Sequence, residues 1–347
     1  MSSNERPIAA TAAERNAPAR AADRGRLSTV RLDFFLNPAE RLTEQERALM
    51  TSMLHCLVGD VAAELRAGLP SGWASANDDE ALLVDTLSRA RLLDDPELIA
   101  LLLRRADEER IGSAARGRSG RHDARAIQTL VSHPNGEVSG ATMGLVLARG
   151  RRRDRFGQCL IGFDDLTRGT AERLVHAIAA VMRRDAAAAE GAAAADRELS
   201  AAASAVLDRH ETARGTEALI AALVAALDSA GGVTEELLLS CAQEGEVGFL
   251  AHVVAVRAGI AGDVARDELF SGSAHRLMAL LRLSGFSRDF SASLLAGIGD
   301  LLGIDDAAEA IGIFDALSVD EVAAAASWLS ASASYRGAIE ALGRADG

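Results

Sequence analysis

Apolar residues recur at helical spacing along most of this 347-residue chain, and this periodicity limits the possible folds more than any other feature. Thr43 and Glu46 form a capping box, after which leucine, methionine and valine return every three or four residues as far as position 65. The pattern predicts a long amphipathic helix that ends near Gly68 and Pro70.

Other helix boundaries follow the same rules. Asp95 precedes Pro96, so a helix is expected to begin there and to end in a glycine-rich loop over residues 112–120. Apolar spacing predicts another helix over residues 167–184. No stretch alternates β-branched and polar residues for long enough to predict a strand.

Glycine follows successive apolar runs in the second half of the chain, which predicts consecutive short helices with glycine C-caps. Ser287 is expected to start one of these helices, and the capping box of Ser318 and Glu321 opens the last long helix, through Trp328 to Leu342. The glycines are Gly215, Gly231, Gly232, Gly245, Gly262, Gly272, Gly285 and Gly303.

These patterns predict an all-α fold of HEAT-like stacked helix pairs, arranged as two consecutive helical bundles without a sheet. Residues 1–26 lack apolar periodicity and are expected to form a disordered N-terminal tail. A HEAT-like helical domain is expected over residues 27–185 and a second helical domain over residues 197–347. Residues 186–196 are rich in alanine and are interpreted as a linker or a helix extension.

Composition excludes several classes of function. All 37 basic residues are arginine, so P-loop, protein-kinase and Schiff-base chemistry, each of which needs a lysine, are excluded in their usual forms. Three isolated cysteines give neither a disulfide framework nor a metal pair, which favours a reducing, cytoplasmic location. No uninterrupted apolar run approaches the roughly 20 residues that span a bilayer, so no membrane association is expected.

The residues that could carry chemistry have a simpler structural interpretation. Asp305, Asp306 and Glu309 are spaced like magnesium-binding carboxylates, but a helix N-cap is expected at Asp305. Asp164 and Asp165 are interpreted in the same way, as caps of the next helix. The seven histidines lack metal-ligand spacing, and no nucleophile elbow or complete dinucleotide fingerprint occurs. We therefore predict no catalytic, metal-binding or cofactor-binding residue, and a chain that is not an enzyme.

Residues 104–155 are rich in arginine and carry a local positive charge, unlike the acidic remainder of the chain. This segment holds 12 Arg against 6 acidic residues, whereas the whole chain has a net charge of -13. The segment is either a pair of solvated loops or a surface that binds carboxylates or phosphates of a partner, since arginine binds both groups bidentately. The candidate partner-binding residues are Arg116, Arg118, Arg121, Arg149, Arg151, Arg152, Arg153 and Arg155.

Several stretches resemble a bacterial family of the alphaproteobacteria, domain of unknown function 2336. These are LTEQERALM and VAAELRAGL within residues 42–69, DPELIALLLRRADEER at 95–110, FDDLTRGTAERLVHAIAAVMRR at 163–184, GEVGFLAHVVAVRAGI at 245–260, and LMALLRLSGFSRDF at 277–290. The resemblance covers roughly residues 30–345. It implies a HEAT-like helical array followed by a helical C-terminal part, and it transfers no site residues.

The sequence leaves three functional hypotheses, of which the first two are favoured over the third. The leading hypothesis is a non-enzymatic helical scaffold that binds another protein, because stacked helices expose extended binding faces. The alternative is a nucleic-acid-associated protein that uses residues 104–155, although the acidic remainder of the chain disfavours it. An enzyme without a recognisable motif comes third.

Overall fold

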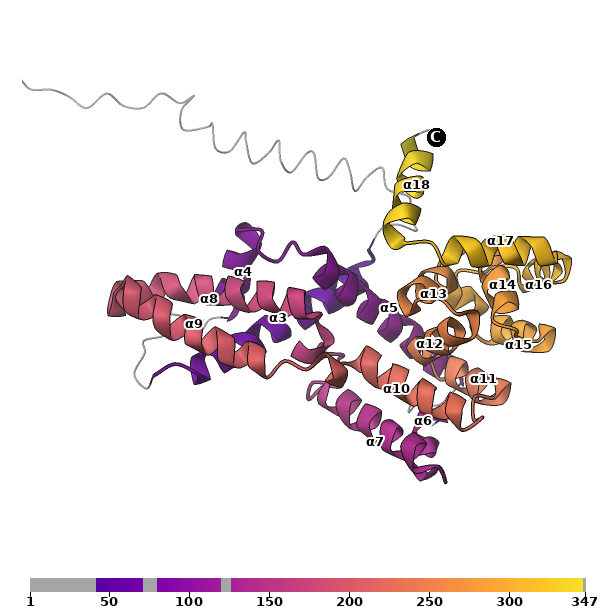
Figure 1. Cartoon of the computed structure of the whole chain (residues 1–347), viewed down its shortest axis with the longest axis horizontal. Coiled ribbons are helices and arrows are strands. Elements are labelled where there is room, and N and C mark those ends of the chain that lie inside the picture. Colours follow the sequence, from indigo (N-terminus) through magenta and orange to yellow (C-terminus); the bar gives the residue numbers. More distant parts are fainter. Residues whose placement is uncertain (1–41, 71–79, 120–125, 346–347) are drawn as a thin grey trace, which may run out of the picture. The chain divides into compact units, whose positions relative to one another are not determined.

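The chain folds as an array of α-helices joined by short turns (Figure 1). The computed structural model describes residues 42–70, 80–119 and 126–345, and the predicted tail of residues 1–26 lies outside them. Within the described residues there is no strand, only an isolated bridge between Arg153 and Cys159. The all-α prediction is confirmed.

The bounds of the helices divide the described chain into elements of very different length. Up to residue 208 the α-helices are α3 (Glu44–Ala67), α4 (Glu80–Arg89), α5 (Pro96–Ser119), α6 (Ala126–Thr129), α7 (Gly136–Arg151), α8 (Arg168–Glu190) and α9 (Ala192–Asp208). Beyond it they are α10 (Thr216–Ser229), α11 (Glu235–Gln243), α12 (Val247–Ala258), α13 (Gly262–Leu269), α14 (Ala274–Leu283), α15 (Arg288–Ile298), α16 (Ala307–Ala316), α17 (Val319–Leu329) and α18 (Ala333–Ala345). Short 3₁₀ turns are η2 (Leu130–Ser132), η3 (Phe163–Asp165), η4 (Thr212–Arg214) and η5 (Gly299–Leu302).

The helices begin where their caps predict. At α3 the amide of Glu46 donates to the Thr43 hydroxyl, and the Thr43 amide donates back to the Glu46 carboxylate. Asp95 accepts from the first amides of α5, and Ser287 caps α15. At α17 the capping box of Ser318 is complete. Each cap satisfies amides that have no acceptor inside their own helix.

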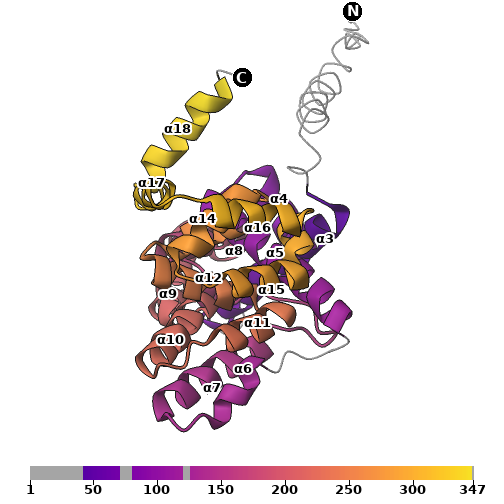
Figure 2. The same cartoon turned by 90° about the vertical axis from the view of Figure 1, so that its right-hand side faces the viewer.

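Two predicted helix ends and one predicted cap are wrong. α5 continues through the expected loop at residues 112–120 as far as Ser119, because the buried Ile111 and Ala115 hold its second half in the core. The last helix stops at Leu329, and a separate helix, α18, extends from the end of α17 (Figure 2). Asp306 rather than Asp305 caps α16.

The close approach of α5 to the turn after α11 explains why glycine occurs inside a helix. Gly245 has a φ of +81°, and a Cβ there would lie 2.2 Å from the Cα of Gly112. Gly245 therefore tolerates no side chain. At Gly112 a Cβ would meet the flexible tip of Arg116 at 2.9 Å and the Gly245 carbonyl at 3.4 Å, so the glycine at 112 serves close packing against Gly245 rather than helix termination. Sequence periodicity cannot distinguish these two uses of glycine.

Two main hydrophobic cores fill the part of the chain from residue 48 onward. The first is formed by α3, α4, the N-terminal half of α5, α8 and α9. The second is formed by the C-terminal half of α5 with α6, α7 and α10 to α17. The helices of the two cores are therefore interleaved along the chain, and α5 belongs to both.

The alanine-rich stretch at residues 186–196 forms the turn of a helical hairpin. α8 ends at Glu190, Gly191 adopts a φ of +85°, and α9 begins at Ala192. Ala186, Ala195 and Leu199 are buried together near this turn. The division into domains at this stretch stays a prediction, as does the HEAT-like character of the helix pairs.

One described helix, α3, is long and apolar enough to cross a membrane by length and composition. Its apolar side chains Met53, Leu57, Val58, Val61 and Leu65 are fully or almost fully buried in the first core. A buried core helix meets the same criterion as a membrane span. The helices α12 and α13, which are bent relative to each other, meet this length and composition criterion only when they are counted as one span.

Candidate functional site

The predicted partner-binding arginines come from three places in the fold. Arg116 and Arg118 lie in the last turns of α5, and Arg149 and Arg151 end α7. The turn after α7 carries Arg152, Arg153 and Arg155, and Arg121 lies outside the described residues. α7 itself packs beside α6 and α10 (Figures 1 and 2).

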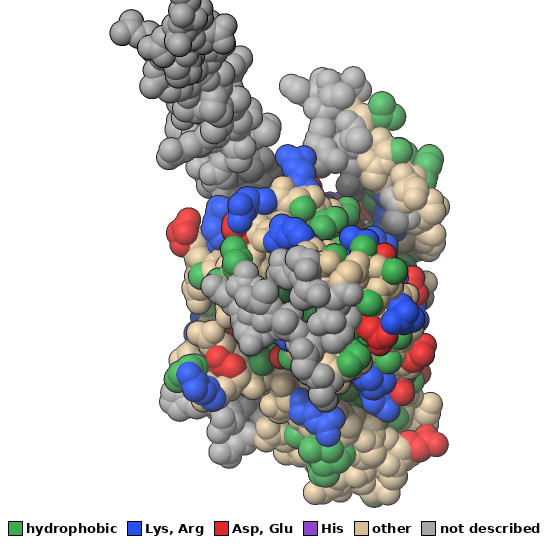
Figure 3. All heavy atoms as spheres, turned by 90° about the vertical axis from the view of Figure 1, so that its left-hand side faces the viewer, with side chains coloured by type: hydrophobic (Ala, Val, Ile, Leu, Met, Phe, Trp, Pro, Cys, Tyr) green, Lys and Arg blue, Asp and Glu red, His purple; other side chains and the backbone are tan. Residues whose placement is uncertain are grey.

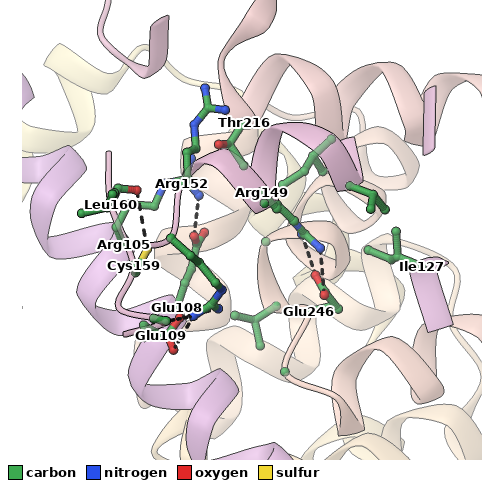
Figure 4. A pocket seen from close by; sticks show the side chains of 18 of the residues that line it. Arg105, Glu108, Glu109, Ile127, Arg149, Arg152, Cys159, Leu160, Thr216 and Glu246 are labelled. Atoms are coloured by element: carbon green, nitrogen blue, oxygen red, sulfur yellow. Dashed lines mark hydrogen bonds and ion pairs between the residues drawn. The ribbon is translucent and has the colours of Figure 1, made fainter. Parts of the chain in front are cut away.

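Arg149 points inward and binds Glu246, the N-cap residue of α12. Its two terminal nitrogens lie 2.8 and 2.6 Å from the two carboxylate oxygens, a bidentate pair that Figure 4 shows from close by. The Glu246 side chain is only 11% exposed. Because the carboxylate is held by Arg149, it makes no capping bond to the amides of α12.

Arg152 organises the loop before α8 through Asp165. Its Nε lies 2.6 Å from Oδ2 of Asp165, whose side chain is 1% exposed. Oδ2 also accepts from the Gly162 amide, and Oδ1 accepts from the amide of Thr216 at 2.6 Å. Burial raises the pKa of Asp165, but the charges of Arg105 and Arg152 outweigh it and lower that pKa overall. The prediction that Asp165 caps the helix that follows is wrong: Thr167 caps α8, and Asp165 binds the first amide of α10.

Three further predicted arginines are also bound to carboxylates. Arg116 and Arg153 share Glu109, at 3.4 and 3.1 Å, and Arg118 pairs with Asp300 at the surface. Most of the basic segment is therefore neutralised within the fold. Figure 3 draws another face, on the side of α8 and α9, where arginine and acidic side chains are interspersed with apolar ones.

A buried ionic cluster joins α5, α10 and α13, and it was not predicted from the sequence. Arg105 lies 2.6 Å from Glu108 and 3.0 Å from Glu217, and Arg266 lies 2.9 Å from Glu217. Both arginine side chains are 7% exposed. Burial raises the pKa of Glu217, but Arg105 and Arg266 together outweigh it and lower the pKa to about 2. His252 adds a weaker contact, 3.4 Å from Glu217.

Only the three-residue spacing of Arg105 and Glu108 could have been found in the sequence, since such pairs are neighbours on a helix. Glu217 and Arg266 are far away along the chain and belong to the cluster through packing alone. Asp165 and Glu246 were likewise missed as partners of the candidate arginines. Their sequence neighbourhoods carry no signal for a contact across the fold.

A cavity of about 550 Å³ opens between α5, α7, α10 and α12, beside these ion pairs. Figure 4 shows side chains from α5, α7 and α10 around it, together with Glu246 just before α12, and Thr216 lies beside Arg152. Thr216 is 5% exposed, and its hydroxyl has no hydrogen-bond partner. The residues lining the cavity include Arg105, Glu108, Glu109, Arg116, Ile127, Val146, Arg149, Arg152, Arg153, Leu160, Thr216, Ile220, Glu246, Val247 and Gly248.

The opposite side of α7 faces solvent and is unusually apolar. Met143 and Leu147 are 43% and 54% exposed, and Arg151, one turn further, has no ion-pair partner among the described residues. Gly136 and Gly140 lie on the same side, and a Cβ on either would meet nothing within 4 Å. We call Gly136, Gly140, Met143, Leu147 and Arg151 the α7 outer face.

Phe156 follows this helix in an exposed turn. Its side chain is 75% exposed, the guanidinium of Arg155 lies 4.7 Å from its ring centroid, and Arg155 forms no ion pair with a described residue. Of the eight predicted arginines, Arg151 and Arg155 are therefore the two described ones that remain available to a partner. Such cation–π contacts keep the guanidinium edge free to donate.

The thiols and metal-type ligands offer little chemistry within the described residues. No group of three His, Cys, Asp or Glu side chains there could hold a metal ion. Burial and nearby carboxylates raise the pKa of Cys56, and burial raises that of Cys159 to about 11 and that of Cys241 further. Protonated thiols of this kind are poor nucleophiles.

Comparison with known proteins gives a family but no characterised relative. The sequence model of DUF2336, described as an uncharacterised protein conserved in bacteria, matches residues 85–326. No curated protein matches the chain, and no solved structure does.

Proposed function

We propose that this chain, which belongs to the bacterial family DUF2336, is a non-enzymatic helical scaffold that binds another protein through the α7 outer face. The observation that carries the proposal is the apolar, solvent-facing stripe on a helix whose other side is already packed. Val138, Thr142, Leu145 and Ala148 bury the inner side of α7. A helix of this kind ordinarily presents polar side chains to water, so the outer stripe is available for a partner.

The composition of the stripe favours a helix of the partner as its occupant. Exposed glycine inside a helix costs about 1 kcal/mol relative to alanine, and Gly140 gains no packing inside this chain in return; Gly136, at the start of α7, is equally open. Without side chains they allow another backbone to approach closely. Met143 and Leu147 would then pack into the partner, as methionine and other large apolar side chains do at interface centres.

The charge at the end of the stripe favours an acidic partner. Arg151 and Arg155 have no ion-pair partner among the described residues, and the guanidinium of Arg155 lies over the exposed Phe156 ring. Arginine and aromatic residues are the side chains that most often dominate binding energy in interfaces. A partner helix with acidic residues near one end would therefore match the α7 outer face in both shape and charge.

Nucleic acid is the less supported ligand. Arg116, Arg118, Arg149, Arg152 and Arg153 are bound to carboxylates, so few cations remain for phosphates. Phosphate contacts provide most non-specific affinity for nucleic acid, and an overall charge of -13 opposes them.

The test is affinity purification from the native bacterium, with nuclease present, followed by binding measurements with the captured protein. The double substitution Met143→Asp with Leu147→Asp should weaken binding by at least about tenfold, and Arg151→Ala with Arg155→Ala should do so in a salt-sensitive manner. Val319→Asp is the matched control, because Val319 is 80% exposed on α17, away from this surface.

Two outcomes would overturn the proposal. One is a captured protein whose affinity is the same for the α7 double variant as for the control. The other is submicromolar binding to DNA or RNA that the Arg151 and Arg155 substitutions abolish, which would favour the nucleic-acid alternative. Arg152 is unsuitable for such a test, since removing it would leave the buried Asp165 without its ion pair.

A further inference from the structure

We propose that the cavity between α5, α7, α10 and α12 binds a small organic molecule carrying an oxyanion, either a phosphate or a carboxylate. This site lies on the inner side of α7 and is distinct from the protein-binding outer face. Hydrogen-bond donors from several helices meet in the cavity, and its volume of about 550 Å³ is that of an ordinary small-molecule pocket.

The first observation is the hydroxyl of Thr216. This residue is 95% buried and lines the cavity, yet the hydroxyl has no hydrogen-bond partner. A buried polar group without a partner destabilises a fold, and native proteins rarely retain one. A valine would fill the same space without that penalty, so the hydroxyl is explained by a ligand atom that it binds.

The second observation is the pair of helix N-termini at the cavity. Thr216 begins α10, which has 14 residues, and Val247 begins α12, which has 12. The first amide of α10 already donates to Asp165, whereas α12 has no side-chain cap, because the Glu246 carboxylate is held by Arg149. The first amides of α12 have no acceptor within the helix, and both helix dipoles present their positive ends.

The charges of the lining favour an anion over a cation. Five arginines and three glutamates line the cavity, and each glutamate already accepts from an arginine. Glu108 is bound by Arg105, Glu246 by Arg149, and Glu109 by two arginines at once. The five arginines are themselves paired with carboxylates, but each guanidinium has five N–H donors, and positive charges outnumber negative ones in the lining by two, which favours an oxyanion.

The walls between these donors are apolar, which favours an organic molecule over a free ion. Ile127, Val146, Leu160, Ile220 and Val247 all contribute to the lining. Inorganic phosphate would leave most of the cavity unfilled. An oxyanion held near Thr216 and the α12 amides, with its carbon skeleton against these side chains, would use both kinds of surface.

The substitution Thr216→Val separates binding from folding. It removes one donor and keeps the side-chain shape, so the ligand-free variant should melt at the same temperature as the native chain or higher. AMP and succinate, each at about 10 mM and compared with chloride at equal ionic strength, test the two oxyanion chemistries. We expect at least one to raise the melting temperature of the native chain and to bind Thr216→Val at least about tenfold more weakly.

Two further variants guard against a structural explanation. Arg116→Gln should weaken binding of the same probe, because it removes a charge from the cavity while Glu109 keeps its ion pair with Arg153. Thr142→Val is the matched control: Thr142 is a fully buried threonine of α7 outside the cavity lining, and its hydroxyl donates to the Val138 carbonyl. This control should leave the probe's affinity unchanged.

The negative outcomes are specific. If neither AMP nor succinate binds the native chain, the proposal is wrong. If inorganic phosphate binds while the organic probes do not, the cavity holds an adventitious ion only. Equal affinity of a probe for the native chain, Thr216→Val and Arg116→Gln would place its binding elsewhere and would also overturn the proposal.

Discussion

Replacing Glu217 by glutamine tests the buried ionic cluster that joins α5, α10 and α13. The substitution keeps the side-chain shape and removes the negative charge between Arg105 and Arg266. The pKa of Glu217 falls from 4.5 to about 2 on folding, and at about 1.4 kcal/mol per unit this corresponds to roughly 3 kcal/mol of unfolding free energy at neutral pH. Glu217→Gln should therefore be less stable than the native chain by about that amount.

The pH dependence of this effect has a definite sign. Because the folded pKa lies below the unfolded one, the stabilisation is complete above about pH 4.5 and is lost as the pH falls toward 2. Urea unfolding followed by circular dichroism should show the full difference at neutral pH and a much smaller one at about pH 3. Glu236→Gln is the control, since Glu236 is exposed on α11 and has no ion pair with a described residue.

Either of two results would refute this reasoning. A Glu217→Gln variant within about 0.5 kcal/mol of the native chain at neutral pH would show that desolvation cancels the gain from the ion pairs. A variant that loses as much stability as the native chain on acidification would show that other carboxylates, such as Asp165, account for the acid sensitivity.

Three other changes probe separate features of the fold. Gly245→Ala should lower the unfolding free energy by about 2–4 kcal/mol, because it adds both backbone strain and a close contact with Gly112. Gly231→Ala, also at positive φ but in open space, should lower it by only about 1 kcal/mol. Equal losses of unfolding free energy would contradict the packing argument. Ser318→Ala should cost about 1 kcal/mol in urea unfolding, and no loss would mean that the capping box adds nothing. Cys159, with a pKa raised to about 11, should be alkylated much more slowly at neutral pH than an unfolded thiol, and equal rates before and after adding urea would disprove its protection.

The sequence allowed the helices to be predicted because their signals are local. Thr43, Asp95, Ser287 and Ser318 each act on amides within three residues, so the caps could be recognised without a structure. Gly112 misled the prediction because its purpose is contact with a residue more than a hundred positions away. The end of a helix depends on what packs against it, and periodicity does not report that.

The sequence predicted which arginines gather near α7 but only partly how their side chains are arranged. The excess of arginine near α7 could be seen in the sequence. Which of these arginines face inward depends on carboxylates contributed by distant segments: Arg149 and Arg152 do, whereas Arg151 and Arg155 do not. The cavity was not predicted at all. Thr216 gives no signal in the sequence, because a threonine at a helix start is ordinary and only burial makes its hydroxyl unusual.

The sharing of α5 between two cores has a consequence for cooperativity. Leu98, Leu101 and Leu102 anchor one end of this 24-residue helix, and Ile111 and Ala115 anchor the other. An isolated helix gains little stability in water, so melting either core would deprive α5 of half the surface that maintains it. The two cores should therefore unfold cooperatively. Calorimetry should record a single transition whose van't Hoff and calorimetric enthalpies agree.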